Sequence, residues 1–168
     1  RMSPPPARRL DQPSLQKDTP LARECLLHGL ARRARLDAAE AARRWSGIRG
    51  RYTFTQEDIA KLERRIGLSA ATQGLADAHE MLNRVDISWT DETVHQWRVR
   101  SALRAENWNA VLQSIEALPA EMASKPLWQY WRARALEKRG LEKQANENQI
   151  GRASGRERME RWGGGGAR

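Results

Sequence analysis

Apolar residues recur at the spacing of an α-helix throughout residues 21–149, and this periodicity constrains the fold more than any other feature. Ile59, Leu62 and Ile66 form one such stripe, and further stripes follow it along the chain. No segment alternates apolar and polar residues over enough positions to indicate a strand. The sequence therefore predicts an all-α fold.

Residues that begin and end helices divide this region into short segments. Thr55 is a candidate N-cap for the helix that carries Ile59. Ser88 or Thr90 is expected to begin a later helix, and Gly140 is expected to end the last one. Because only a few residues separate these helices, consecutive helices are expected to lie antiparallel as hairpins.

A short pattern occurs twice in the second half of the chain. Trp97-Arg98-Val99-Arg100 resembles Trp131-Arg132-Ala133-Arg134, and the offset is 34 residues. This offset is the period of tetratricopeptide-type helix pairs, which stack with a continuous core. The repeat predicts an α-superhelix, or solenoid, of tetratricopeptide-like hairpins.

The chain contains seven Trp but only two Tyr and one Phe. Four of the tryptophans lie at helical spacing and are expected to form the structural core: Trp97, Trp108, Trp128 and Trp131. On that interpretation, replacing Trp131 with alanine would destabilise the fold by roughly 3–5 kcal/mol. The alternative is a platform on which the indole rings stack against sugars.

Charge and glycine are unevenly distributed. Residues 150–168 carry five Arg, two Glu and a run of four glycines, and residues 1–20 contribute four basic and two acidic residues, so the formal charge of +9 falls to +4 over residues 21–149. We predict a flexible Pro-rich start over 1–20, an α-superhelical domain fragment over 21–149, and a disordered Gly- and Arg-rich tail over 150–168. The tail is expected not to be natural protein, because residues 150–154 match a translated sequencing adapter.

A basic cluster in the first helices is the best candidate for a surface that binds a polyanion or a glycan. Such binding needs grouped Arg or Lys side chains, with aromatic rings for stacking. The cluster also suits a basic helical repeat that binds RNA, but arginines on Ala-rich helices ordinarily form a solvated outer face, so we expect no nucleic-acid partner. Its members are Arg32, Arg33, Arg35, Arg43 and Arg44, with Trp45 and Tyr52 nearby.

Candidates for catalysis and metal binding are weak. His79 and Glu80 resemble the start of a zinc-protease motif, but Asn83 stands where the second histidine ligand is required. The carboxylate pairs at 57–58 and 91–92 fall in first helical turns, where the helix dipole explains them. We expect no catalytic, metal or cofactor site, and no membrane span, since no apolar run approaches about 18 residues.

One block carries a family resemblance. The stretch Leu127-Trp128-Gln129-Tyr130-Trp131-Arg132-Ala133-Arg134-Ala135-Leu136, which follows Leu118-Pro119, resembles the soluble lytic murein transglycosylases. It looks like the late part of the superhelical U-domain that precedes their catalytic domain. Trp97-Arg98-Val99-Arg100 and the helix that begins Gln56-Glu57-Asp58-Ile59 fall in the order that this family shows, so the likeness runs from about 35 to 147.

The resemblance implies a periplasmic enzyme that cleaves the β-1,4 bond between N-acetylmuramic acid and N-acetylglucosamine without water, leaving a 1,6-anhydro end. Family members use the Glu of a Glu-Ser motif, and this chain contains no Glu-Ser dipeptide. We therefore expect a fragment without the catalytic domain, inactive alone, in which the helical ring guides glycan strands. A stand-alone tetratricopeptide-like module that binds a protein partner is the alternative.

Overall fold

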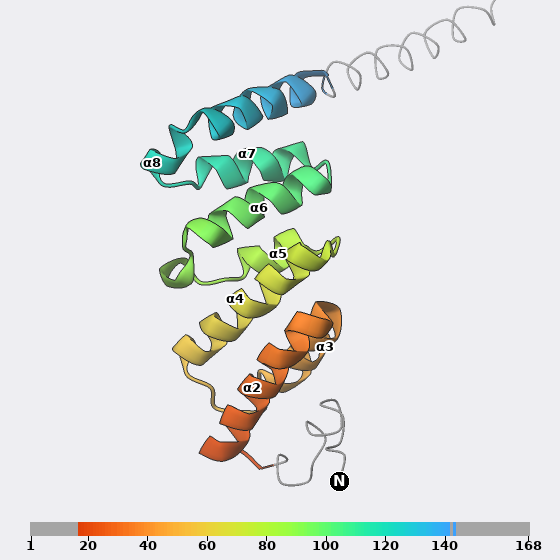
Figure 1. The fold of residues 1–168 in the computed structure, drawn as a ribbon, viewed down its shortest axis with the longest axis vertical. Coiled ribbons are helices and arrows are strands. Elements are labelled where there is room, and N and C mark those ends of the chain that lie inside the picture. The colour runs from red at the N-terminus through yellow and green to blue at the C-terminus, as the bar shows by residue number, and fades with distance from the viewer. Residues whose placement is uncertain (1–16, 142, 144–168) are drawn as a thin grey trace, which may run out of the picture. The chain divides into compact units, whose positions relative to one another are not determined.

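The structure is a computed structural model that describes residues 17–141 and 143. These residues form helices joined by short connections, with no strand among them, which confirms the all-α prediction (Figure 1). They fall into two compact units that divide between Glu106 and Asn107. The predictions for the tail over 150–168 and for most of the start over 1–20 lie outside the described residues.

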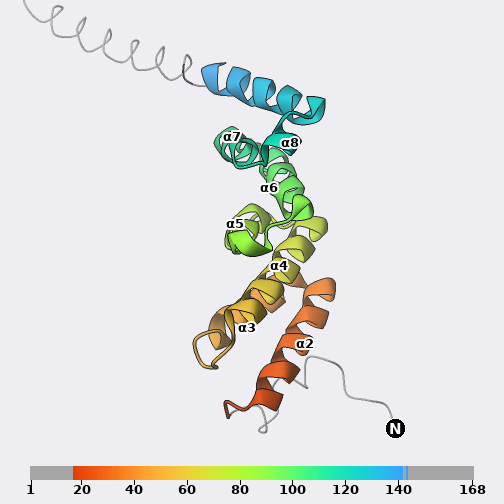
Figure 2. The ribbon, with the colours of Figure 1, turned by 90° about the vertical axis from the view of Figure 1, so that its left-hand side faces the viewer.

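The first unit is built from helices that pack on their neighbours in the chain. α2 and α3 form a hairpin, α4 packs against both, α5 turns back against α4, and α6 packs on α5 and α4 (Figures 1 and 2). The elements are α2 (Pro20–Leu36), α3 (Ala38–Ile48), α4 (Gln56–Gln73), α5 (Ala78–Asn83), the 3-10 turn η2 (Ile87–Trp89) and α6 (Glu92–Arg104). The hairpins predicted from the short connections are therefore present in this unit.

Side-chain caps explain where these helices begin. Thr55 accepts a hydrogen bond from the backbone N–H of Asp58 at 3.1 Å, as predicted. The prediction that Ser88 or Thr90 begins α6 is wrong, because Asp91 is the N-cap and accepts from the N–H of Val94 at 3.0 Å. The hydroxyl groups of Ser88 and Thr90 instead donate to Asp86.

Glycine ends α4 and allows α5 to approach it. Gly74 has φ 76°, a left-handed conformation that glycine adopts without steric strain, and its N–H bonds to the carbonyl groups of Ala70 and Ala71. Two turns earlier, a Cβ atom on Gly67 would lie 3.0 Å from Cδ2 of Leu82. Gly74 therefore ends α4, and Gly67 lets α4 pack closely on α5.

Two apolar clusters hold the first unit together. In the first, Trp45 is 5% exposed, packs at 5.1 Å from the ring of Phe54, and donates from Nε1 to Glu63 at 3.1 Å. That cluster joins α2, α3 and α4 through Leu26, Leu30, Ala34, Ala41, Trp45, Phe54, Leu62 and Ile66. The second contains mostly small residues, which lets α3, α4, α5 and α6 pack closely: Ala38, Ala70, Ala71, Ala78, Leu82 and Val94.

The second unit contains α7 (Trp108–Glu116), α8 (Ala120–Ala123) and a longer helix over 126–141. Its buried apolar residues are Ala110, Val111, Leu112, Ile115, Leu118, Met122, Trp128 and Ala135. Gly140 does not end the last helix, contrary to the prediction, because Leu141 is still helical. Gly140 is exposed and has no neighbouring atom within 4 Å of an added Cβ, so an ordinary helical position suffices there.

The prediction that four tryptophans fill the core needs correction for three of them. Trp128 is 3% exposed, whereas Trp97, Trp108 and Trp131 are only half-buried. An indole ring is large, so a tryptophan on a helix flank can cover apolar neighbours with one face and leave the other in water.

Within the described part of the chain, no helix combines the length and the apolar character needed to cross a membrane.

Candidate functional site

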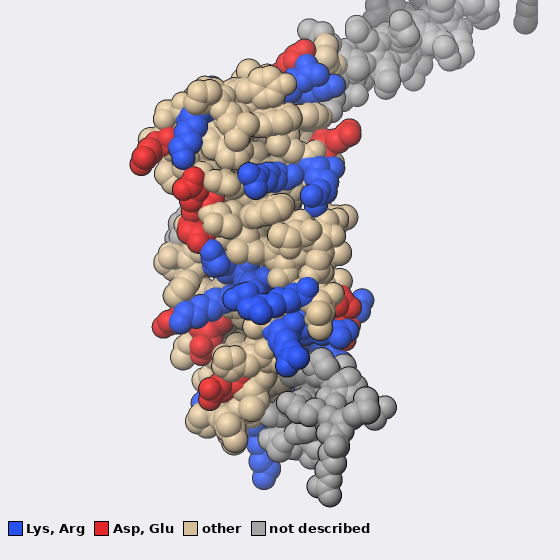
Figure 3. Space-filling view, viewed as in Figure 1, with Lys and Arg blue, Asp and Glu red and all other residues tan. Residues whose placement is uncertain are grey.

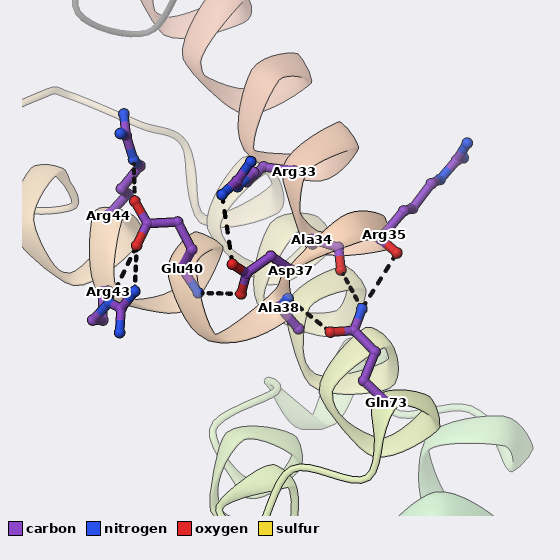
Figure 4. Close-up of polar contacts among 9 residues, drawn as sticks. All are labelled: Arg33, Ala34, Arg35, Asp37, Ala38, Glu40, Arg43, Arg44 and Gln73. Atoms are coloured by element: carbon purple, nitrogen blue, oxygen red, sulfur yellow. Dashed lines mark hydrogen bonds and ion pairs between the residues drawn. The ribbon is translucent and has the colours of Figure 1, made fainter. Parts of the chain in front are cut away.

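Two carboxylates, Asp37 and Glu40, pair with part of the predicted basic face on α2 and α3. Glu40 accepts from Arg44 at 2.7 Å and from Arg43 at 2.5 Å, and these bonds lower the pKa of Glu40 to about 2 (Figure 4). Arg33 lies 3.5 Å from Asp37, which also caps α3. Three of the five arginines expected to bind a polyanion are thus engaged by Asp37 and Glu40.

The other two predicted arginines are exposed. Arg32 and Arg35 make no side-chain ion pair or hydrogen bond within residues 17–141 and 143, and Figure 4 shows the Arg35 side chain directed away from the other residues drawn. The Arg35 backbone is nevertheless fixed, because Gln73 on α4 donates to the carbonyl groups of Ala34 at 2.8 Å and Arg35 at 3.3 Å. Gln73 also accepts from the N–H of Ala38 at 2.9 Å, so it ties α4 to the turn between α2 and α3.

A groove of about 670 Å³ lies between α2 and α4. Its apolar lining comes from Leu27, Ala31 and Leu62, and charged side chains from both helices surround it. We call it the α2–α4 groove, lined by Pro20, Arg23, Glu24, Leu27, His28, Ala31, Thr53, Thr55, Asp58, Lys61, Leu62 and Arg65. Its volume lies in the range of small-ligand sites.

A second hollow, of about 450 Å³, adjoins the α2–α4 groove across α4. Lys61 and Arg65 line both. Trp89 is the aromatic residue in the second hollow, and the Lys61 ammonium lies 5.3 Å from its ring centroid. Figure 3 shows Lys and Arg side chains gathered in a band over α4 and the adjoining end of α2.

Arginines and aspartates at the rim of these hollows are mostly paired. Arg64 pairs with Asp91. Burial opposes a low pKa for Asp91, but the N–H of Val94 and the Arg64 guanidinium together lower it. Arg23 lies 3.3 Å from Asp18, whose pKa is lowered by the hydroxyl and N–H of Thr53. Arg65 differs, since it is exposed and has no such partner in the described chain.

The four predicted core tryptophans do not come together as a sugar platform within either unit. The Arg100 guanidinium lies 5.4 Å from the ring of Trp97, and the Lys138 ammonium lies 6.0 Å from that of Trp108. Tyr130 meets Trp131 edge to face at 5.2 Å. A cation therefore lies near the ring of Trp97 and of Trp108, and Trp131 packs on a second aromatic ring.

The histidine motif on α5 has a structural role. Nδ1 of His79 lies 3.0 Å from the carbonyl oxygen of Arg98, and Nε2 lies 2.9 Å from the Asn83 amide. Both ring nitrogens are thereby engaged by protein groups. Among the described residues, no three His, Cys, Asp or Glu side chains lie together as metal ligands.

Sequence reasoning missed three residues that matter in the structure. Trp45 is buried, and its i, i+3, i+7 spacing with Ala38 and Ala41 was a usable signal. Arg98 on α6 is 9% exposed and donates to the backbone carbonyl of Leu82 on α5. Its equivalent in the 34-residue repeat, Arg132, is exposed. Arg65 lies at the junction of the two hollows, and no local pattern distinguishes it from the paired arginines beside it.

Comparison with solved structures gives an informative match. No protein-family model matches the chain, and no curated protein matches it. A solved structure that matches is an inactive variant of the lytic transglycosylase Slt from Pseudomonas aeruginosa, with a TM-score of 0.71 and 27% sequence identity. The match covers 79% of this chain and 22% of that one, so the chain spans about a fifth of that protein's length.

The match bears on both the fold and the family. The sequence identity of 27% comes with a similar fold over 79% of the chain. This agrees with the fold class expected from the helical repeat. The resemblance first indicated by the Trp-x-Tyr-Trp-x-Ala block is confirmed: the chain resembles, in sequence and in fold, a part of a lytic transglycosylase.

Proposed function

We propose that this chain is a piece of a lytic transglycosylase that acts on murein, and that the piece serves as helical scaffold and guide for the glycan strand. The observation that carries the proposal is the match to Slt at a TM-score of 0.71 over 79% of the chain. On this proposal residues 21–149 belong to the helical domain, and the catalytic domain is not part of the chain. The parent enzyme is periplasmic and makes 1,6-anhydro products.

The features of the helices agree with a guiding role. The α2–α4 groove and the adjoining hollow are open and carry charged side chains, which agrees with contact to a polymer that bears carboxylates. The best histidine candidate, His79, is engaged by Asn83 and by the backbone of Arg98. Binding without cleavage is therefore the activity that we propose for the chain.

Sedimentation with purified murein sacculi tests this proposal. The chain is expected to pellet with sacculi and to leave no anhydro-muropeptides in the supernatant by mass spectrometry. Chitin particles are the matched control, because they lack the peptides and lactyl groups of murein. A chain that stays in solution with sacculi contradicts the guiding role, and this is the result that a protein-interaction module predicts. Release of anhydro-muropeptides by the chain contradicts the assignment of the chemistry to another domain.

The parent enzyme is tested separately by recovering the full reading frame. A Glu-Ser motif in a lysozyme-like domain beyond residue 149 is the expected finding. Genuine coding sequence over 150–168 would contradict our proposal that this tail is not natural protein.

A further inference from the structure

α5 is a short helix that depends on its neighbours. It contains six residues, Ala78–Asn83, and its N-cap residue Asp77 makes no side-chain hydrogen bond to it. Isolated helices shorter than about 12–15 residues are only marginally stable in water. The side chains that hold α5 against the rest of the first unit therefore decide whether it stays folded.

Met81 is the residue of α5 that joins the two apolar clusters of the first unit. Its side chain packs against the cluster that contains Trp45 and against the cluster that contains Leu82. Of the described residues that belong to these clusters or pack on them, no other is common to both. The link from α5 to α6 is of another kind, because His79 and Arg98 supply hydrogen bonds there. Loss of the Met81 packing would therefore loosen α5 from the cluster of Trp45 while its bonds to α6 remain.

A small hollow gives solvent access to Met81. Met81 lines this hollow together with Trp45 and Ile66, and its volume is about 40 Å³. A space of about 10–15 Å³ already admits a water molecule, so the hollow also admits hydrogen peroxide, which has one oxygen atom more. Met81 is partly exposed, whereas Met122 in the second unit is only 6% exposed. A small oxidant therefore reaches Met81 more readily than Met122.

We propose that Met81 is a site of oxidation by peroxides, and that its sulfoxide releases α5 from the cluster of Trp45. The thioether sulfur attacks one peroxide oxygen, so that an S–O bond forms and the O–O bond breaks. The other oxygen takes both protons of hydrogen peroxide and leaves as water. The sulfur loses two electrons and the peroxide gains them.

The sulfoxide changes the packing because it is polar. A polar group without a hydrogen-bond partner is unfavourable against the apolar residues of both clusters, so the oxidised side chain is expected to turn toward water. This inference goes beyond the proposed function, because it concerns a covalent modification that does not depend on glycan binding.

Hydrogen–deuterium exchange followed by mass spectrometry tests the proposal on the full chain after treatment with hydrogen peroxide. The exposed Cys25 is first blocked with N-ethylmaleimide, so that its thiol is not oxidised. The peptide that contains α5 is expected to gain one oxygen several-fold faster than the peptide that contains Met122. The amides of α5 are then expected to exchange about tenfold faster, while those of α7 stay unchanged. Methionine sulfoxide reductases should restore the slow exchange.

Three variants connect this change to the sulfur of Met81. Met81→Leu keeps the side-chain volume, so it should exchange like the parent before peroxide and show no change after it. Met122→Leu is the matched control and should keep the full response of α5. Met81→Gln places a polar side chain of similar length there and should show fast exchange of α5 without peroxide. Circular dichroism checks that each variant remains helical.

Three results would overturn the proposal. The first is oxidation of Met122 as fast as that of Met81. The second is unchanged exchange of α5 in chains that carry the sulfoxide at Met81. The third is a response of Met81→Leu to peroxide that equals the response of the parent.

Discussion

Arg98 on α6 is a buried arginine whose partners are backbone carbonyl groups. Its Nη2 donates to the carbonyl oxygens of Leu82 at 2.9 Å and Val85 at 3.2 Å, and Nε donates to Leu82 at 3.2 Å. Burial lowers the pKa of the guanidinium, so the buried charge is itself unfavourable. Each hydrogen bond to a charged group contributes about 1.5–3 kcal/mol, and release from desolvation returns part of this when the charge is removed. We expect Arg98→Met to lower the free energy of unfolding by about 2–3 kcal/mol.

Urea unfolding followed by circular dichroism measures this change. With a slope typical of a small protein, the midpoint is expected to fall by about 1 M or more. Arg132→Met is the control, because Arg132 occupies the same place in the 34-residue repeat but is exposed, and it should change stability by no more than about 0.5 kcal/mol. Equal midpoints for the two variants would refute the reasoning, since they would show that the bonds from Arg98 add nothing beyond its desolvation. Arg98→Lys should recover part of the loss, because an ammonium group can reach one of the two carbonyls.

Three further predictions concern single side chains. Trp128→Ala should destabilise the second unit by about 3–5 kcal/mol, and Trp131→Ala by clearly less, because Trp128 is 3% exposed and Trp131 is half-buried; equal melting temperatures of the two variants would contradict this. Gly74→Ala should lower stability by about 1–2 kcal/mol in a thermal melt, since φ is 76° there, and an unchanged melt would contradict the role of that turn. Burial, and to a smaller degree the Arg98 charge, lower the pKa of His95 in the folded protein. As pH falls, His95 is therefore protonated in the unfolded chain before it is protonated in the folded one. The free energy of unfolding should therefore be highest above the unfolded pKa of about 6.5 and should decrease as pH falls below it. In His95→Gln the urea midpoint should decrease less over the same pH range, because glutamine takes up no proton.

Local sequence was enough to predict helices whose signals are local. Thr55 and the stripe that follows it predicted α4, because a capping hydroxyl and an apolar face act within one or two turns. The start of α6 was placed on Ser88 or Thr90 because either hydroxyl group can cap a helix. Asp91 prevails since Asp86 engages both of those hydroxyl groups, and that competition cannot be read from residue types alone.

The basic face could not be predicted in the same way, because ion pairing depends on both local and tertiary geometry. Glu40 lies three and four residues before Arg43 and Arg44, so their pairing was available from helical spacing. In contrast, Arg49 pairs with Glu63 on α4, and Arg64 pairs with Asp91 at the start of α6. Only the packing of α4 shows that Arg65, next to Arg64, keeps its charge available at the groove.

The 34-residue repeat explains why one sequence pattern gave both a correct fold and an incorrect core. The buried positions Val94 and Trp128 are related by this offset, as are the half-buried Trp97 and Trp131, so the repeat places equivalent helix faces correctly. The arginine that follows each tryptophan differs in its surroundings: Arg98 is buried with backbone partners, and its counterpart on the last helix is exposed. A repeat specifies which face of a helix packs on its own hairpin, while burial of the remaining faces depends on neighbours that the pattern does not contain. Trp-Arg-x-Arg is thus a signature of helix register, and the role of each arginine has to be taken from its tertiary contacts.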